Sequence, residues 1–196
     1  MKRVLDVVLA AIGLVLLSPV IVLIGFLIKL DSEGPILHRM EWVGLRGRRF
    51  VGYKLRTMVS DAEQQRESLT RFNEMTGPVF KMRHDPRVTR VGQFLRRTSI
   101  DELPQLFSVL LGDMSLVGPR PPGPHEYADF RPEQRLKLAV TPGITCLWQI
   151  SGRSAISDFE EWIQLDMEYI RNWSLWLDLK ILLRTVPVVL TGRGAR

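Results

Sequence analysis

The feature that most constrains this chain is its N-terminal run of residues 7–28, which is 22 residues long and carries no charge. A helix of about 20 apolar residues crosses a hydrocarbon core of about 30 Å, so the length predicts contact with a membrane. Ser18 and Pro19 lie near the middle of the run. Proline lacks a donor N–H and clashes with the carbonyl four residues before it. We therefore expect a bend at Ser18-Pro19.

Positive charge flanks this run on both sides, with Lys2 and Arg3 before it and Lys29 and Arg39 after it. Lys and Arg mark the cytoplasmic ends of membrane segments, so both ends are predicted to face the same side. We favour a re-entrant helix-break-helix anchor over residues 1–30. A straight spanning helix kinked at proline is the alternative. A cleaved signal peptide is disfavoured, because the run exceeds a typical h-region and no small-x-small site follows it.

Residues 31–196 are predicted to form one domain, since 45% of the chain is hydrophobic and 24% is charged. Residues 39–97 hold 14 Lys and Arg against 6 Asp and Glu, whereas the whole chain has a net charge of +6. This basic zone suits an anionic leaflet, nucleic acid or a phosphorylated substrate, or is a solvated face without a partner. Cys146 stands alone, which excludes an internal disulfide, and the three histidines show no metal-ligand spacing.

The pattern of apolar residues predicts a mainly α fold with a small β component, the α+β class. Some helices are amphipathic and lie either at a membrane surface or on the core. The expected elements are a hairpin of residues 36–40 and 50–55 around 44–47, an exposed helix over 61–74, a basic helix within 79–97, a strand over 144–150, a helix from Asp158 and an interrupted apolar helix within 172–190.

An acidic pair, Asp101 and Glu102, is predicted to start a helix. Ser99 with Glu102 fits a capping box, and Pro104 fits the first turn. Capping alone explains such a pair. Because Arg96 lies within about a turn of it, a site for a phosphate with a metal is the competing interpretation.

Two loops present arginines. Arg120 lies between Pro119 and Pro121, whose rigid backbone lowers the entropy lost when Arg120 binds an anion; a plain structural turn is the alternative. Arg153 lies on a second loop. Asp166 falls on the apolar side of a helix, where a carboxylate needs a partner, and we expect an arginine such as Arg153.

Seven motifs in order make the chain resemble the monotopic phosphoglycosyl transferases of the bacterial sugar transferase family along essentially its whole length. Each motif alone is weak, but their order is specific. The motifs are residues 2–6 before the apolar run with Ser18-Pro19, residues 53–58, 95–105, 112–121, 141–145, 151–153 and 172–176.

The resemblance implies that a sugar 1-phosphate passes from a UDP-sugar to a polyprenol phosphate such as undecaprenyl phosphate, with release of UMP. It implies a place in the bacterial inner membrane, with the catalytic domain on the cytoplasmic face, as the first membrane step of glycoconjugate assembly. Matched motif by motif, Asp101 is the nucleophile, Asp101 and Glu102 hold Mg²⁺, Lys54 and Arg96 contact phosphate, Pro119, Arg120 and Pro121 bind the nucleotide, and Arg153 contacts substrate phosphates or the active-site carboxylates.

A second hypothesis explains the same basic zone without catalysis, as a membrane-surface adaptor that binds anionic lipid or a partner protein. Nucleic acid is not an expected partner, because the basic residues adjoin the anchor and no recognised motif is present. The identity of the sugar is left open, although residues 77–81 resemble those of members that transfer hexose 1-phosphates. Prenyl length and homo-oligomerisation are also left open.

Overall fold

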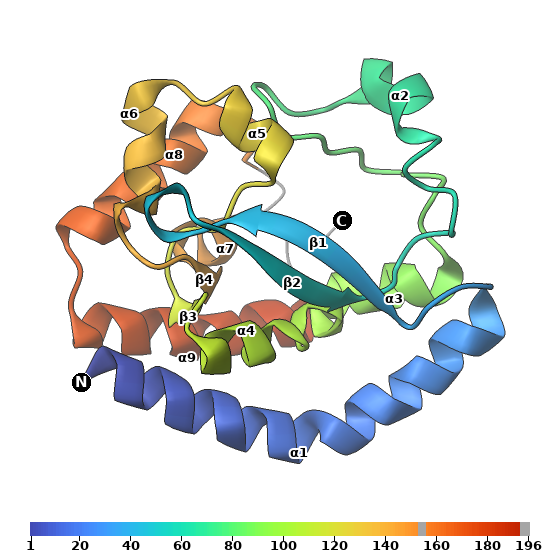
Figure 1. Cartoon of the computed structure of the whole chain (residues 1–196), viewed down its shortest axis with the longest axis horizontal. Coiled ribbons are helices and arrows are strands. Elements are labelled where there is room, and N and C mark those ends of the chain that lie inside the picture. Colours follow the sequence, from blue (N-terminus) through green and yellow to red (C-terminus); the bar gives the residue numbers. More distant parts are fainter. Residues whose placement is uncertain (153–155, 193–196) are drawn as a thin grey trace.

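The computed structural model describes residues 1–152 and 156–192. Helices dominate this part of the chain, and its strands form two sheets of two strands each, which confirms the predicted α+β class. Figure 1 shows the elements in order. They are α1 (Lys2–Asp31), β1 (Leu37–Val43), η1 (Leu45–Gly47), β2 (Arg49–Leu55), α2 (Arg66–Leu69), η2 (Thr70–Phe72), α3 (Arg90–Thr98), η3 (Ile100–Glu102), α4 (Gln105–Leu111), β3 (Ser115–Val117), α5 (Pro124–Ala128), α6 (Pro132–Arg135), η4 (Leu136–Ala139), β4 (Gly143–Thr145), α7 (Leu147–Ile150), α8 (Phe159–Arg171) and α9 (Leu175–Thr191).

Strands β1 and β2 form an antiparallel hairpin that pairs Leu37 with Leu55 and Val43 with Arg49. Its turn contains Gly47 with φ 83°, in the left-handed region that favours glycine. The hairpin expected around residues 44–47 is therefore confirmed. It crosses the middle of the molecule (Figure 1), and Lys54 lies near the C-terminal end of β2.

Strands β3 and β4 pair in parallel. A Cβ atom on Gly143 would lie 2.0 Å from the backbone nitrogen of Gly118, so the close approach of these two segments requires glycine. The strand predicted over residues 144–150 is wrong beyond β4, because α7 follows it at once. Helix α7 places the Trp148 ring parallel to that of Trp162, with centroids 4.1 Å apart.

The predicted helices over residues 61–74 and within 79–97 are shorter than expected. Only α2 and η2 form in the first region, and α3 begins at Arg90. The amide oxygen of Asn73 accepts from the backbone N–H groups of Met75 (3.2 Å) and Lys81 (2.8 Å). Side-chain bonds of this kind compete with helical hydrogen bonds, which explains the irregular backbone here.

Helix α1 continues through Pro19 and bends in its middle (Figure 1). Proline 19 cannot donate to the carbonyl of Val15 four residues earlier. The Ser18 hydroxyl donates to that same carbonyl at 2.9 Å, so the orphaned acceptor is satisfied within the helix. The predicted break at Ser18-Pro19 therefore takes the form of a bend in one continuous helix.

The N-terminal end of α1 is bound to β3 and α9. Lys2 Nζ donates to Asp178 Oδ2 at 2.7 Å. The buried carboxylate of Asp6 accepts from Ser115 Oγ at 2.8 Å and from the Leu116 amide at 3.1 Å. These contacts join the first two turns of the helix to the centre of the globular domain.

The C-terminal end of α1 is bound to the same domain. Arg56 is 6% exposed, and its guanidinium donates to the carbonyls of Ile28 at 3.3 Å and Ser32 at 2.6 Å. Asp31 Oδ2 accepts from the Val91 amide at 3.0 Å. Cations near a helix C-terminus satisfy its free carbonyls and its dipole. Both ends of the bent helix thus contact one globular body.

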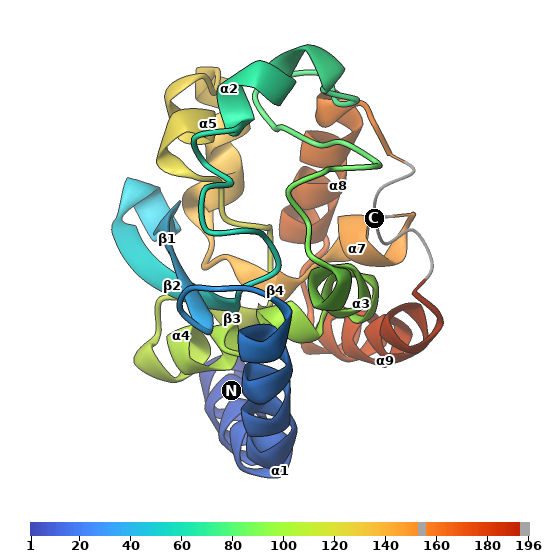
Figure 2. The same cartoon turned by 90° about the vertical axis from the view of Figure 1, so that its right-hand side faces the viewer.

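The middle of α1 is left uncovered. Among the described residues α1 is the one helix long and apolar enough to cross a membrane, judged by length and composition, and only 11% of its most apolar window is buried. Helices α3, α4 and α9 lie next to it on the same side of the molecule (Figure 2), and each of them carries exposed apolar side chains. The exposed members on these three helices include Phe94, Phe107, Leu111, Trp176, Leu183 and Leu190. A surface this large and apolar indicates an interaction site.

Candidate active site

The junction between β2 and α3 positions two cationic side chains. Thr57 follows β2, and its carbonyl accepts from the Thr89 amide at 3.1 Å. A Cβ atom on Gly92 would lie 2.1 Å from this carbonyl oxygen, so glycine allows α3 to pack against the end of the strand. Thr57 Oγ1 accepts from Arg96 Nε at 3.0 Å. Lys54 of β2 and Arg96 of α3 are thereby brought to one place.

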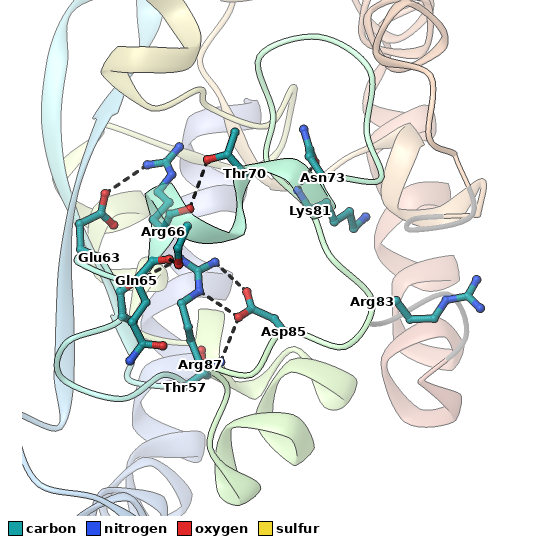
Figure 3. A network of polar contacts seen from close by, with 12 residues as sticks. Thr57, Glu63, Gln65, Arg66, Thr70, Asn73, Lys81, Arg83, Asp85 and Arg87 are labelled. Carbon is teal, nitrogen blue, oxygen red and sulfur yellow. Dashed lines mark hydrogen bonds and ion pairs between the residues drawn. The ribbon is translucent and has the colours of Figure 1, made fainter.

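A buried ion pair holds the segment between these elements (Figure 3). Arg87 Nη2 lies 2.7 Å from Asp85 Oδ2, and both side chains are about one-twentieth exposed. Arg87 also donates to the Ala62 carbonyl at 3.1 Å. Burial raises the pKa of Asp85 and the hydrogen bonds with Arg87 lower it, and the net result is a lowered pKa. The network fixes the irregular segment against Thr57, and so supports the position of Arg96.

The acidic pair lies in a tight turn between α3 and α4. Ser99 ends α3 in the left-handed conformation with φ 54°, and η3 then places Asp101 and Glu102. The predicted capping box is wrong, because α4 takes Pro104 as its N-cap and the Glu102 amide bonds the backbone carbonyl of Ser99 at 3.1 Å. Pro104 was expected in the first turn and instead directly precedes it, and α4 ends with Gly112 as its C-cap.

The structure brings Lys54, Arg96, Asp101 and Glu102 together. Lys54 Nζ lies 2.8 Å from Glu102 Oε1, and Asp101 is 8% exposed. Burial raises the pKa of Asp101 to about 6, while the charges of Lys54 and Arg96 lower it and that of Glu102 raises it. Burial also lowers the pKa of Arg96. A carboxylate held in this setting is poorly solvated, which favours reaction with an electrophile.

The Pro-Arg-Pro loop approaches the same site through an aromatic side chain. Pro119 and Pro121 are buried, whereas the Arg120 side chain is 29% exposed. The Arg120 Cζ atom lies 5.0 Å from the ring centroid of Trp42, and Lys54 Nζ lies 5.7 Å from that ring. Trp42 therefore links the loop to the Lys54–Glu102 pair.

Several predicted residues lie elsewhere. Ser18 and Pro19 lie at the bend of α1 and are exposed. Arg153, expected to bind substrate, falls outside the described residues. The expected partner of Asp166, Arg153, also falls outside the described residues. Among the described residues Asp166 pairs with Lys137, whose Nζ lies 2.5 Å from Asp166 Oδ2. Lys137 is buried, whereas most lysines lie on protein surfaces, so the sequence offered no reason to expect it as the partner.

Sequence reasoning missed Trp42, Glu126 and Trp162 as neighbours of Arg120. Arg120 Nη1 lies 3.3 Å from Glu126 Oε2, and Arg120 Cζ lies 5.5 Å from the Trp162 ring. Glu126 stands six residues after Arg120, a local signal that was available. The two tryptophans come from β1 and α8, and only the tertiary fold reveals their proximity.

Asp101 and Glu102 are chemically suited to a magnesium ion. Mg²⁺ takes oxygen ligands and is usually held by one or two carboxylates together with substrate phosphates and water. Within the described residues there is no group of three or more His, Cys, Asp and Glu side chains that could hold a metal alone. Two adjacent carboxylates, one of them buried, are what a metal shared with a phosphate ligand needs.

Two adjacent carboxylates, one of them buried, lie among cations and beside an apolar surface, an arrangement typical of membrane-associated proteins that bind phosphorylated ligands. Residues 1–192 match the family model described as bacterial sugar transferase, and the chain belongs to this family. The resemblance drawn from the motifs is thereby confirmed.

Curated relatives match essentially the whole chain. Galactosyl transferase CpsE of Streptococcus agalactiae serotype III is 50% identical over 195 residues, which cover 100% of this chain and 43% of the relative. The UDP-glucose:undecaprenyl-phosphate glucose-1-phosphate transferase of Caulobacter vibrioides is 46% identical, with 99% and 71% covered. The exopolysaccharide production protein ExoY of Rhizobium meliloti is 39% identical, with 99% and 87% covered. The chain thus spans less than half the length of several relatives it matches.

Proposed function

We propose that this protein transfers a hexose 1-phosphate, such as that of galactose or glucose, from a UDP-sugar to a polyprenol phosphate and releases UMP. The relatives named above support the class of reaction. The observation that carries the proposal is the buried Asp101 carboxylate, which lies among Lys54, Arg96 and Glu102 on the side of the domain that adjoins α1.

In the first step an Asp101 carboxylate oxygen attacks the phosphorus that bears the sugar. A bond forms from this oxygen to phosphorus, the bond from phosphorus to the bridging diphosphate oxygen breaks, and UMP leaves with that oxygen. In the second step a phosphate oxygen of the polyprenol phosphate attacks the same phosphorus and frees the Asp101 carboxylate. Covalent catalysis of this kind divides a three-body encounter into two transfers.

Cationic side chains offset the repulsion between an anionic nucleophile and an anionic diphosphate. The charges of Lys54 and Arg96 act on Asp101, and we assign both side chains to phosphate binding. Arg120, with the buried Pro119 and Pro121 of its loop, is assigned to the nucleotide. Mg²⁺ held by Asp101 and Glu102 would neutralise charge that develops on the phosphate oxygens. We propose a phosphate-binding role for Arg153 as well, on the motif match.

We propose that α1 enters and leaves one leaflet of the bacterial inner membrane, with the domain on the cytoplasmic face. Both ends of α1 bind the same domain, through Asp178 at one end and Arg56 at the other. A helix that crossed the bilayer would place its ends about 30 Å apart on opposite sides, where one domain cannot bind both. A re-entrant anchor lets the site take a soluble nucleotide sugar from water and a prenyl phosphate from lipid.

A screen of UDP-hexoses tests the proposal. Purified protein in detergent or nanodiscs is given Mg²⁺, undecaprenyl phosphate and each donor in turn, and UMP is measured. We expect release with at least one hexose, loss of release with EDTA, and at least a 1,000-fold loss in Asp101→Asn. Lack of UMP with all donors would favour the non-catalytic membrane-surface adaptor, and near-normal turnover of Asp101→Asn would exclude the nucleophile.

A further inference from the structure

One indole, that of Trp42, contacts two cations that come from different parts of the chain. Lys54 of β2 is 5.7 Å from its ring centroid, and Arg120 of the Pro-Arg-Pro loop is 5.0 Å from it. Trp42 itself is 2% exposed. A cation over an indole face is attracted by the ring quadrupole, most strongly where water is excluded. One buried ring is therefore placed to fix both cations.

Arg120 contacts a second ring and a carboxylate. Its Cζ atom lies 5.5 Å from the ring of Trp162, which is backed by Trp148 at 4.1 Å with an interplanar angle of 16°. Glu126 Oε2 lies 3.3 Å from Arg120 Nη1. Two rings from β1 and α8 and one carboxylate thus constrain the planar guanidinium. We call Trp42 and Trp162 the aromatic clamp.

Two details favour a role for the clamp beyond filling the core, and the first is shared by Trp148, whose ring stacks on that of Trp162. The indole N–H groups of Trp42 and Trp162 are buried and have no hydrogen-bond partner among the described residues. Burying an unpaired donor is unfavourable, and a phenylalanine would fill a core without that cost. The backbone also leaves room for Trp42, because a Cβ atom on Gly52 would lie 2.7 Å from its Cδ1 atom.

We propose that the aromatic clamp positions Arg120, and through Trp42 also Lys54, so that both cations meet the diphosphate of the nucleotide sugar at a fixed spacing. This inference rests on the proposed function. Side chains that move freely in water lose conformational entropy when a ligand orders them. Cations already held against aromatic rings lose less of it when the diphosphate binds. Trp42 and Trp162 are positioning residues, since they act through the cations.

The test compares Trp42→Leu, Trp42→Phe and Gly52→Ala with the wild-type enzyme, measuring the KM for the UDP-hexose and kcat separately. Trp42→Leu is expected to raise KM roughly tenfold and to leave kcat within about threefold, from the strength of the two cation–π contacts. Trp42→Phe keeps an aromatic face and is expected to restore KM to within about threefold. Gly52→Ala, which displaces the ring without removing it, is expected to raise KM as well.

Phe50→Leu is the matched control. Phe50 is the cross-strand partner of Trp42 and is 8% exposed, yet it makes no cation–π contact within residues 1–152 and 156–192. Its loss is expected to lower stability and leave KM unchanged. In an Arg120→Ala background, Trp42→Leu is expected to raise KM by clearly less than in the wild type, because one of its two partners is gone.

The outcomes distinguish the two proposals. If the wild type releases no UMP from any UDP-hexose, the proposed function and the clamp fall together. If the wild type is active and folded Trp42→Leu keeps the wild-type KM, only the clamp is excluded. If Trp42→Leu does not fold, the other two variants decide. A raised KM in Gly52→Ala with a near-normal KM in Trp42→Phe supports the clamp. An unchanged KM in Gly52→Ala excludes it. A KM rise in Phe50→Leu equal to that of Trp42→Leu would also exclude it.

Discussion

Two lysine–carboxylate pairs in this molecule differ in their access to water. Lys137 and Asp166 lie 2.5 Å apart with side chains 3% and 1% exposed. Lys54 and Glu102 lie 2.8 Å apart with side chains 18% and 23% exposed. The buried Lys137–Asp166 pair, here called the closed pair, cannot exchange partners unless its surroundings unfold. The partly exposed Lys54–Glu102 pair, here called the half-open pair, can admit a phosphate or a metal. The same chemistry thus serves the fold in one place and is available to a ligand in the other.

The largest expected effect comes from breaking the closed pair. Lys137→Met removes the amine that pairs with the buried Asp166 carboxylate, and we expect a loss of stability of about 3–5 kcal/mol. Adding Asp166→Leu should recover most of this loss, because the double variant buries no charge. Chemical denaturation measures both. A loss below about 1 kcal/mol in the single variant would show that the pair is hydrated in solution.

The same change at the half-open pair is expected to affect activity instead. Lys54→Met removes a proposed phosphate contact, and we expect a loss of about 100-fold in kcat/KM for the UDP-hexose. Stability should change by less than about 1 kcal/mol, since Glu102 can hydrate when Lys54 is lost. Denaturation and UMP release are measured on the same preparation. Unfolding of Lys54→Met, or unchanged activity, would contradict the contrast between the pairs.

Asp101 lies next to the half-open pair. Its ionised, buried carboxylate is expected to lower the free energy of unfolding when no metal is bound. Burial raises its pKa from 3.8 to about 6, so the folded state holds the proton more tightly than the unfolded chain. Stability therefore falls as the pH rises from about 4 to about 6 and stays lower above that. Asp101→Asn carries no charge and should exceed the wild type by about 2–3 kcal/mol at pH 8 in EDTA.

Denaturation of both proteins across this pH range tests the sign of the effect. The advantage of Asp101→Asn should vanish below about pH 4, where the wild-type carboxyl is protonated in both the folded and the unfolded state. An advantage that does not depend on pH would mean that burial of the charge is not its cause.

The smallest effect is expected at an open pair. Arg66 Nη1 lies 3.3 Å from Glu63 Oε1, but the side chains are 39% and 83% exposed. Water and salt screen such a pair, so Arg66→Ala should change stability by no more than about 0.5 kcal/mol. A thermal melt suffices to measure it. A larger loss would mean that the segment in Figure 3 depends on Arg66 for its structure.

The contrast between the two pairs also shows what the sequence could predict. Asp101, Glu102, Arg96 and Lys54 belong to local motifs, and their order along the chain was enough to select them. The hairpin and the bend at Pro19 were predictable for the same reason, because turn chemistry and proline act on neighbouring residues.

Contacts between distant segments were not predictable. Lys137 reaches Asp166 across 29 residues, and its burial is a property of the packed domain. Trp42 meets Arg120 only because the hairpin folds over the loop after β3. Apolar periodicity predicted too much helix in residues 56–89. Polar side chains such as that of Asn73 form hydrogen bonds with the backbone there, and these replace helical hydrogen bonds.

The central claim is that Asp101 accepts the sugar phosphate covalently. Intact-protein and peptide mass spectrometry after incubation with the active UDP-hexose and Mg²⁺, without polyprenol phosphate, tests it most directly. We expect a mass gain of one hexose phosphate on the peptide that contains Asp101, removed when undecaprenyl phosphate is added and absent in Asp101→Asn. An adduct on another residue, or UMP release that requires the acceptor and leaves Asp101 unmodified, would contradict the account.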